Sequence, residues 1–335
     1  LYEELIARLR GHVRELQEAS SAIGVIDNLA AFADLALTND YVRPELVEHP
    51  ELLIRDGRHP IVENAVPGGY VPNDTEMSSV EKQILILTGA NMAGKSTYMR
   101  SVALLCIMAQ TGSFVPARFA RVGIVDRVFT RVGASDDLAG GQSTFMVEML
   151  ELANILNNAT ERSLILLDEI GRGTSTVDGY SIARAVLEFL HGKGAEGPRT
   201  LFATHFHQLI SIESELRRVR NYHFAVKEDA HDITFLRKLI PGATDRSYGI
   251  HVARIAGVPK KVLTRAEEVL KSALREDAAS GGQKYYTQML LFDSAPTEAV
   301  PSAVEERVRE VNPNEMTPMQ ALMFITELKA LLEKN

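Results

Sequence analysis

The chain has 335 residues, 45% of them hydrophobic and 24% charged, and its formal net charge is −8. This balance is typical of a globular protein with about two domains. No apolar run reaches the roughly 18 residues that a membrane span needs, and the single cysteine, Cys106, excludes an internal disulfide and favours a reducing compartment. The negative charge disfavours a chain that wraps nucleic acid by itself, because such domains are basic.

The first part of the chain carries a helical pattern. Apolar residues recur there at three- and four-residue steps, with charged residues between them: Leu5, Leu9, Val13 and Leu16. This pattern predicts an amphipathic helix followed by a second helix. Because the chain begins within the pattern, and with leucine instead of methionine, we expect it to be part of a longer polypeptide. Residues 41–74 contain several prolines and predict loops and short strands, because proline breaks helices and central strands alike.

Four apolar runs alternate with helical sequence between residue 84 and about residue 240: ILILT, RVFTRVG, SLILLDE and TLFATH. A buried strand of a parallel sheet is apolar on both faces, and parallel strands are joined by helices. The alternation therefore predicts an α/β fold in which a mostly parallel sheet is flanked by helices.

The carboxyl-terminal part changes character. The segment SYGIHVARIAGVPKKVLTRAEEVLKSALRE predicts two helices, because Gly257 suits the end of the first and Pro259 the start of the second. Residues 276–315 include AASGGQK and DSAPTEAVPSAVEER and are predicted to be a flexible linker. In residues 316–335, a threonine and a proline favour the start of a last short helix.

A glycine-rich loop directly follows the first apolar run and matches G-x-x-x-x-G-K-[ST]: Gly89, Ala90, Asn91, Met92, Ala93, Gly94, Lys95 and Ser96. Its glycines allow the backbone N–H groups to surround one oxyanion, and the following helix adds its positive N-terminal end. Lys95 is expected to bridge the outer phosphates of a nucleotide, and the Ser96 hydroxyl to bind Mg²⁺. The flanking strand and helix favour this interpretation over a chance glycine turn.

Two further apolar runs end in residues that suit phosphate chemistry. SLILL is followed by Asp168, which is expected to hold Mg²⁺ through water, and by Glu169, which is expected to polarise an attacking water. An ordinary solvated turn is the alternative for these two acids, and the nearby phosphate loop disfavours it. His205 follows TLFAT and is predicted to contact the γ-phosphate or the attacking water, unless it only packs at the strand end. His207 carries no such argument.

Residues 135–149 form a second candidate anion site. The segment SDDLAGGQSTFMVEM places glycines, a glutamine and two hydroxyl groups ahead of a helix. One chain does not need two phosphate sites around one nucleotide, whereas a symmetric dimer uses both if this segment covers the nucleotide of the partner. A simple helix-capping turn is the alternative. Asp178, in the segment STVDG, is expected near the same dimer interface.

Together these motifs resemble the ATPase domain of the MutS family of DNA mismatch-repair proteins. The resemblance covers roughly residues 1–275 and rests on GANMAGKSTYMR, DDLAGGQSTFMVEM, LLDEIGRGTSTVDG and ATHFHQL, with RHPIVE, YVPND and SYGIHVARIAGVP in the family's order. The stretch DEIGRGTST separates this branch from transporter ATPases and from the family's recombination-suppressing paralogues. The resemblance implies a P-loop NTPase fold of the ABC-ATPase type, with lever or core helices before it and dimerisation helices after it.

The resemblance also implies domain boundaries. Residues 1–45 would end the core and lever helices, and residues 46–275 would be the ATPase domain. That domain would include a helix-turn-helix dimerisation element at about residues 245–275. The linker and the last helix complete the chain, with the bounds given above.

The resemblance implies individual roles as well. ATP would be bound by residues 89–97, of which Thr97 is the last, and Asn91 would sense the nucleotide state. Ala90 stands where the family commonly has proline, which removes no ligand. Ser143 would act in trans on the partner's γ-phosphate.

Catalysis is implied for Glu169 with help from His205, and Mg²⁺ would be held by Ser96 and Asp168. The family's partners would be a second copy of the chain, MutL, and mismatched double-stranded DNA, contacted mainly through domains outside these residues. The setting would be a prokaryotic cytoplasm, with association with the nucleoid during repair and no membrane partner.

A short peptide in the linker, QMLLFD, resembles the motif by which bacterial repair proteins bind the replication sliding clamp. Gln288, Leu291 and Phe292 would be its anchors, with apolar side chains entering a groove. Short apolar runs are common in linkers, so a plain linker is the alternative.

Two rival functions remain open from the sequence. The stretch LAGGQ is close to the signature of transporter ATPases, which GRGTSTVDG disfavours. A non-catalytic module that dimerises on binding nucleotide would keep the same site, and Glu169 disfavours it. A GTPase is less favoured still, because the chain has no N-K-x-D stretch. The predicted function is therefore an ATP-binding and ATP-hydrolysing dimeric switch.

Overall fold

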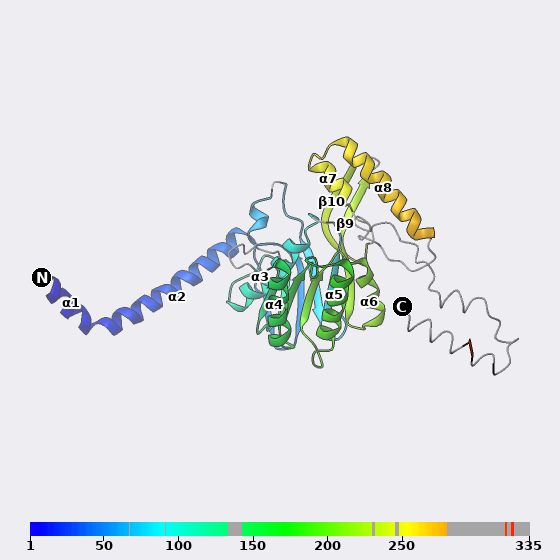
Figure 1. Cartoon of the computed structure of the whole chain (residues 1–335). Helices are drawn as coiled ribbons and strands as arrows, with labels where there is room; N and C mark the ends of the chain where they lie inside the picture. The colour runs from blue at the N-terminus through cyan, green and yellow to red at the C-terminus, as the bar shows by residue number, and fades with distance from the viewer. Residues whose placement is uncertain are drawn as a thin grey trace. The chain divides into compact units, whose positions relative to one another are not determined.

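The computed structural model describes residues 1–279, apart from 67, 91, 133–142, 230–231 and 245–247, and also residues 319, 323 and 324. The chain divides into two compact units, Leu1–Tyr286 and Thr287–Asn335. The described helices and strands of the first unit are drawn in Figure 1. They build a mixed α/β fold with two sheets.

Two helices precede the sheets: α1, Tyr2–Gly11, and α2, Val13–Thr38. The helical conformation is interrupted between them at His12, whose backbone (φ −113°, ψ 10°) is not helical. The predicted apolar pattern is therefore shared by two helices, and its four residues are exposed in the described chain. The two predicted helices are confirmed, and the structure places the break between them at His12, within the apolar pattern.

Helix α2 is also long and apolar enough to cross a membrane, judged by length and composition alone. Four exposed carboxylates lie within it: Glu15, Glu18, Asp27 and Asp34. A single helix of this kind near the amino terminus is weak evidence for a span.

The smaller sheet has four strands in the order β1-β5-β2-β3. Its strands are β1, Glu45–Val47; β2, Glu51–Gly57; β3, Asn73–Ser78; and β5, Phe119–Gly123. A short 3₁₀ helix, η1, spans Val62–Asn64 between β2 and β3. The proline-rich region thus forms the predicted short strands, and β5 joins them from a distant part of the chain.

The larger sheet has six strands in the order β10-β9-β4-β8-β7-β6. Its strands are β4, Ile84–Thr88; β6, Val128–Arg131; β7, Leu164–Asp168; β8, Arg199–Ala203; β9, Val219–Asp229; and β10, Asp232–Pro241. The four apolar runs form β4, β6, β7 and β8, which pair in parallel as predicted. Strand β9 is parallel to β4, and β10 returns antiparallel to β9 at the edge of the sheet.

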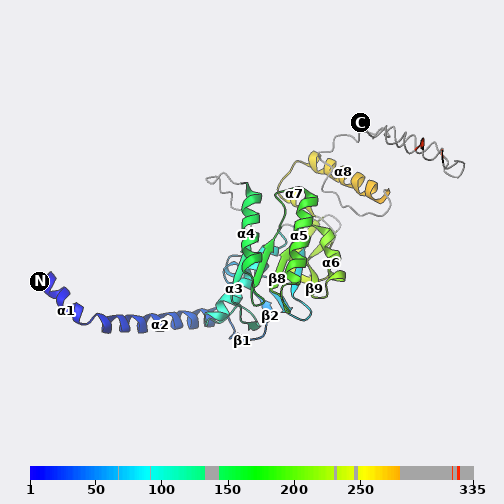
Figure 2. The same ribbon diagram turned by 60° about the horizontal axis from the view of Figure 1, so that its bottom comes forward.

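The remaining helices follow the strands: α3, Lys95–Gln110; α4, Thr144–Asn158; α5, Thr176–His191; η2, His207–Ser211; α6, Ile212–Glu215; α7, Gly249–Ile255; and α8, Lys260–Ala279. Helices α4 and α5 lie on one face of the larger sheet (Figure 2). The two helices predicted around Gly257 are confirmed as α7 and α8, and Gly257 itself has φ 85° between them.

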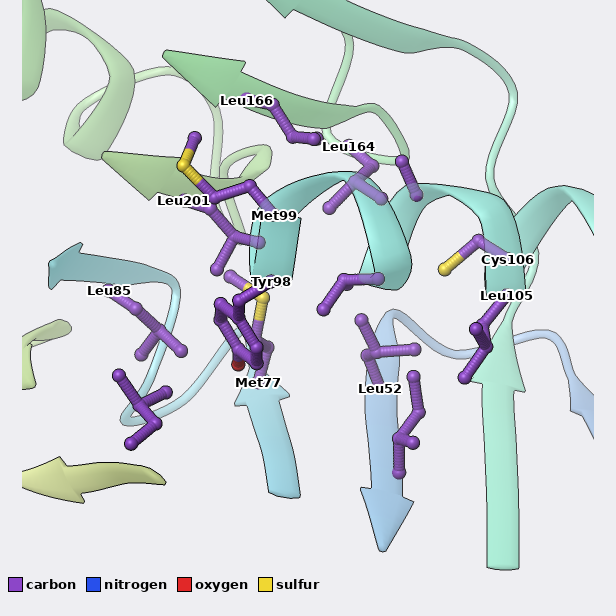
Figure 3. Close-up of a cluster of buried hydrophobic side chains, with 14 of the residues drawn as sticks. Leu52, Met77, Leu85, Tyr98, Met99, Leu105, Cys106, Leu164, Leu166 and Leu201 are labelled. Atoms are coloured by element: carbon purple, nitrogen blue, oxygen red, sulfur yellow. The ribbon is translucent and has the colours of Figure 1, made fainter. Parts of the chain in front are cut away.

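Strand residues alternate between two hydrophobic cores, because successive side chains of a strand point to opposite faces. Leu85, Leu164 and Leu201 pack with α3 and the smaller sheet, as Figure 3 shows. Ile84 and Ile165, on the other face, pack with α4 and α5. Helix α3 therefore lies between the two sheets, and its first turn is fixed from both sides.

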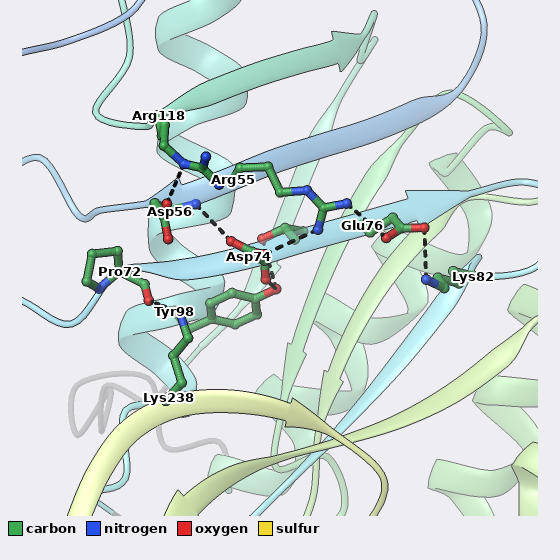
Figure 4. Close-up of polar contacts among 10 residues, drawn as sticks. Arg55, Asp56, Pro72, Asp74, Glu76, Lys82, Tyr98, Arg118 and Lys238 are labelled. Carbon is green, nitrogen blue, oxygen red and sulfur yellow. Dashed lines mark hydrogen bonds and ion pairs between the residues drawn. The ribbon is translucent and has the colours of Figure 1, made fainter.

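Polar contacts connect the first turn of α3 to the smaller sheet (Figure 4). The Tyr98 hydroxyl lies 2.9 Å from the Thr75 hydroxyl of β3, and both residues are buried. On the exposed side of the same strand, Arg55 pairs with Asp74 and Glu76. Exposed ion pairs contribute little to stability, so the buried Tyr98 contact is the stronger constraint on α3.

Candidate nucleotide-binding site

Three parallel strands that lie next to one another, β4, β8 and β7, end at the same edge of the larger sheet. The glycine-rich loop follows β4. Asp168 is the last residue of β7 and Glu169 comes directly after it, while His205 follows β8. Clefts at the carboxyl ends of parallel strands are the usual ligand sites of such sheets. The fold therefore brings together residues that are more than 70 positions apart in sequence, such as Ser96 and Asp168.

The glycine-rich loop has left-handed backbone at both glycines and at one other residue. Gly89 has φ 125°, Gly94 has φ 110° and Met92 has φ 73°. Glycine adopts such angles without the steric cost that a Cβ brings, which explains glycine at both loop ends. Asn91, the predicted sensor of nucleotide state, lies outside the described residues.

Lys95 begins α3 and is buried, with its side chain folded over the loop. Its Nζ donates to the carbonyl oxygens of Gly89, at 2.7 Å, and Ala90, at 3.1 Å. Burial lowers the pKa of Lys95, and the charges of Glu169 and Asp168 partly oppose that shift. A cation held at the loop in this way is placed to neutralise an anion bound there.

Ser96 and Asp168 are in direct contact, with the Ser96 hydroxyl donating to Asp168 Oδ2 at 2.5 Å. Burial raises the pKa of Asp168, and the Ser96 hydrogen bond and the charge of Lys95 oppose that shift. The second oxygen, Asp168 Oδ1, is buried and accepts no hydrogen bond from any residue that the structure describes. A buried carboxylate oxygen without a donor fits a cation ligand, because such oxygens are costly unless paired.

The donor set at this point suits Mg²⁺. Magnesium ions are commonly held by one or two carboxylates together with water and substrate phosphates. Over the described residues, no group of three or more His, Cys, Asp or Glu side chains is arranged to hold a metal. Within the described part of the chain, Ser96 and Asp168 are thus the residues that would hold the ion, together with a nucleotide and water.

Glu169 is held by contacts on every side. Its backbone is left-handed, with φ 57°, and its N–H donates to the carbonyl oxygen of Ala203 at 2.9 Å. Its Oε1 is hydrogen-bonded to His205 Nε2, and its Oε2 lies 2.5 Å from Arg172 Nη1. Burial by itself would raise the pKa of Glu169, but His205, Arg172 and Lys95 outweigh burial and lower it.

His205 therefore contacts Glu169 in the structure, which places it beside the acid that it was predicted to assist. Sequence reasoning missed Arg172, although it lies within the stretch DEIGRGTST. A positive charge three residues after Glu169 could have suggested this ion pair, because the two side chains lie close together in a short loop.

Ser143 is the N-terminal cap of α4, where its hydroxyl accepts a hydrogen bond from the Met146 N–H at 3.1 Å. The capping turn, one of the two interpretations of this segment, is thus present, and Ser143 is exposed. Residues 133–142 lie outside the described chain. A contact of Ser143 with a partner's nucleotide stays a prediction.

Asp178 lies in the first turn of α5 and is exposed. Ser175 caps this helix, because its hydroxyl accepts from the Asp178 N–H at 3.2 Å and donates to Asp178 Oδ2 at 2.8 Å. Asp178 is available on the surface for the predicted interface, which stays untested.

A cavity of about 260 Å³ adjoins the glycine-rich loop, and sequence reasoning did not find it. Gly94 and Thr97 line it on the loop side, and Tyr70, Val71 and Phe224 line it from elsewhere in the chain. Phe224 also packs edge-on against Tyr98, with ring centroids 6.0 Å apart. Apolar and aromatic linings of this kind are typical of ligand pockets. Tyr70 and Val71 belong to the segment YVPND, which resembles the MutS family but was assigned no role. That resemblance was the only sequence signal for this part of the cavity.

The predicted clamp-binding residues Gln288, Leu291 and Phe292 lie outside the described residues. The same is true of residues 316–335, apart from the three positions given above.

Comparison with known proteins gives two family matches. Residues 85–274 match the family described as MutS domain V, and residues 296–331 match that described as DNA mismatch repair protein MutS C-terminal region. The first match spans more than half of the chain and contains the glycine-rich loop from Gly89, Asp168, Glu169 and His205.

Individual relatives show the same similarity over nearly the whole chain. The DNA mismatch repair protein MutS of Methanosarcina acetivorans is 60% identical over 99% of the chain. The proteins of the same name from Methanococcoides burtonii and Caldicellulosiruptor bescii are 59% and 48% identical, each over 98% of the chain. The chain spans 39% of the length of each of these three relatives.

Proposed function

The chain belongs to the MutS family of DNA mismatch repair proteins, and we propose that it binds and hydrolyses ATP as the dimeric switch of such a protein. The corresponding fold is a P-loop NTPase of the ABC type. One observation carries the proposal: Lys95, Ser96 and the acids that end β7 meet at the carboxyl edge of neighbouring parallel strands. A phosphate, a divalent cation and an attacking water can each find a partner there.

We propose that residues 89–97 bind the triphosphate. The left-handed loop and the N-terminal end of α3 present backbone N–H groups to the phosphates, and Lys95 exchanges its carbonyl contacts for phosphate oxygens. The adjacent cavity is the proposed site of the base. Its aromatic and apolar lining, which includes Tyr70 and Phe224, suits a planar ring.

Hydrolysis is proposed to use Glu169 as the group that polarises the attacking water. His205 holds one carboxylate oxygen of Glu169, and the lowered pKa keeps the group ionised. The other oxygen is paired with Arg172, so that contact must loosen before the oxygen can accept a proton from water. Mg²⁺ bound by Ser96 and Asp168 would neutralise charge that develops on the phosphate oxygens.

Dimerisation is proposed to depend on ATP, because Lys95 of one copy and Ser143 of the other would contact the same triphosphate. Hydrolysis removes this bridge. The work available to distant DNA-binding parts can be no larger than the difference in nucleotide affinity between the two states of the dimer.

The partners are proposals of the same kind. Relatives carry the name DNA mismatch repair protein, and most of their length lies beyond the span that this chain covers. We propose that mismatched DNA is contacted mainly by such parts, that MutL and the sliding clamp are protein partners, and that the setting is a prokaryotic cytoplasm. If a synthetic peptide of residues 285–295 fails to bind a bacterial sliding clamp, the clamp is not a partner of this segment.

The activity itself is tested with Glu169→Gln and Lys95→Ala in a phosphate-release assay and an ATP-binding assay. We expect Glu169→Gln to bind ATP and barely hydrolyse it, and Lys95→Ala to bind ATP poorly. Glu188→Gln is the control, since Glu188 pairs with Arg184 on the exposed side of α5. Wild-type turnover by Glu169→Gln would show that another group activates the water. Absence of phosphate release from the wild type would favour the non-catalytic dimerisation module.

A further inference from the structure

Glu148 is a buried carboxylate in the second turn of α4 that contacts the loop after Glu169. Its Oε1 accepts a hydrogen bond from the Gly171 N–H at 2.6 Å. Its other oxygen lies 3.9 Å from Arg131 Nη2 of β6. Both Glu148 and Arg131 are less than 10% exposed. Burying a carboxylate is costly unless it is paired, so these contacts fix its position.

The loop between Glu169 and Gly173 has little freedom to move by itself. Gly171 has φ 89°, and a Cβ built on it would lie 2.6 Å from the Cα of Gly179 in α5. On the other side, a Cβ built on Gly173 would lie 2.9 Å from the Cβ of Phe145 in α4. Both helices therefore touch the loop backbone closely, and a displacement of α4 must move the loop or break its contact with Glu148.

Helix α4 is also capped by the residue proposed to reach the other subunit. Ser143 caps α4, and Glu148 lies five positions after it along the helix. That separation is about 7.5 Å at 1.5 Å per residue, which is short enough for the segment to move as a rigid piece. A displacement at Ser143 would thus reach Glu148 and, through the Gly171 hydrogen bond, the loop that carries Glu169.

We propose that Glu148 is a positioning residue that couples the two nucleotide sites of the dimer. Its carboxylate links the end of α4 that contacts the partner's nucleotide to the loop that hydrolyses the nucleotide of its own subunit. The inference rests on the proposed function, since it needs both ATP hydrolysis and the contact of Ser143 in trans. Glu148 itself touches neither nucleotide.

The first test compares Glu148→Ala, Glu148→Gln and Glu151→Gln in the full-length protein. Glutamine keeps an acceptor for the Gly171 N–H, whereas alanine removes it. Glu151 is the matched control, because it lies on the same helix and pairs with Arg131 at 3.0 Å but is half-exposed. We expect kcat to fall about tenfold or more in Glu148→Ala, with KM little changed, and to recover largely in Glu148→Gln. Equal kcat in Glu148→Ala and Glu151→Gln would overturn the proposal.

A second readout does not depend on activity. Hydrogen exchange in peptides that cover residues 169–175 should be faster in Glu148→Ala than in the wild type, since the Gly171 N–H loses its acceptor. Glu148→Gln and Glu151→Gln should exchange as the wild type does. Unchanged exchange in Glu148→Ala would contradict a positioning role for its carboxylate.

Coupling between the sites is measured with a double-mutant cycle of Ser143→Ala and Glu148→Ala. If Glu148 transmits the contact made by Ser143, the effect of Ser143→Ala on kcat should be smaller in the Glu148→Ala background. Fully multiplicative effects would mean that the two residues act independently and would refute the coupling.

Failure of the proposed function gives a different pattern. In that case the wild type itself would release no phosphate, or it would turn over as a monomer insensitive to Ser143→Ala. If only the coupling fails, the wild type hydrolyses ATP and Ser143→Ala lowers kcat, but Glu148→Ala leaves kcat unchanged.

Discussion

Glu169 occupies a left-handed backbone conformation that costs a residue other than glycine roughly 1–2 kcal/mol. Its N–H contact with Ala203 and the close approach of Gly171 to Gly179 oblige the chain to adopt it. Strain of this kind persists where the surrounding structure enforces it, commonly at functional sites. In this chain it directs the carboxylate toward His205 and Arg172.

The pairing of Glu169 with Arg172 leads to a pH prediction. The pKa of Glu169 is lowered, so the ionised base persists to a lower pH than an ordinary glutamate would allow. Removing the Arg172 charge in Arg172→Ala removes one cause of the lowering and raises the pKa. The acid limb of the rate-against-pH profile should therefore move to higher pH in Arg172→Ala.

ATP hydrolysis measured from neutral pH downward checks this shift, with circular dichroism at each pH to confirm that both chains stay folded. An acid limb at the same or a lower pH in Arg172→Ala would contradict the assignment of Glu169 as the base.

Cys106 illustrates the opposite effect of burial. It is fully buried in α3, and desolvation raises the pKa of its thiol to about 12. Because the thiolate is the reactive form, the folded chain should not react with a thiol reagent at pH 8. One equivalent should react after denaturation in urea. Stoichiometric reaction of the folded chain at that pH would show that this part of α3 opens.

Among single residues, the sequence located those that are adjacent to a strand end. Lys95, Ser96 and Asp168 each follow an apolar run, so chain-local patterns sufficed to place them at one edge of a sheet. Tyr70 and Phe224 come together only through tertiary packing beside Gly94, and no local pattern could pair them. The Glu148 contact with Gly171 is of the same tertiary kind.

Among contacts between elements, those of Arg199 join the two sheets from the start of β8. Arg199 is 1% exposed, and its guanidinium donates to the backbone carbonyl oxygens of four residues: Glu51, Gly123, Ile124 and Arg162. The first two of these lie in the smaller sheet. One planar group with several donors therefore satisfies carbonyls from three segments.

Arg199→Lys should be destabilising, because a single ammonium cannot replace these donors and leaves buried carbonyls unpaired. We expect the free energy of unfolding to fall by about 3 kcal/mol, measured by urea denaturation. Arg118→Lys is the control: Arg118 is exposed and pairs with Asp56, so its loss should be under about 1 kcal/mol. A comparable small loss for Arg199→Lys would show that the carbonyls find other donors.

The parallel strands of the larger sheet could be predicted from sequence, whereas its edge hairpin and the strand order of the smaller sheet could not. The apolar runs of β4, β6, β7 and β8 identified the parallel part of the larger sheet, because fully buried strands are continuous in hydrophobicity. The β9–β10 hairpin was not anticipated, since its strands are partly exposed and less apolar. For the smaller sheet, only short strands were expected. Its strand order could not be predicted, because β5, which follows α3 in the sequence, lies between β1 and β2.

In the proposed dimer, two copies of the chain share their nucleotides. In each copy, the carboxyl edge of the larger sheet would bind one triphosphate and the start of α4 would cover the other. The Glu148 contact would relate these two ends within one chain. Coupling of this kind requires a state-dependent contact at each end, which ATP and its hydrolysis supply.

The most direct measurement is the size of the protein in solution with Mg²⁺ and a non-hydrolysable ATP analogue, for the wild type and Ser143→Ala. Light scattering after size exclusion gives the mass of each. We expect the analogue to convert the wild type to a dimer, and Ser143→Ala to dimerise more weakly while it retains nucleotide binding at residues 89–97. A wild type that binds the analogue and stays monomeric, or a Ser143→Ala variant that dimerises equally well, would contradict the shared site.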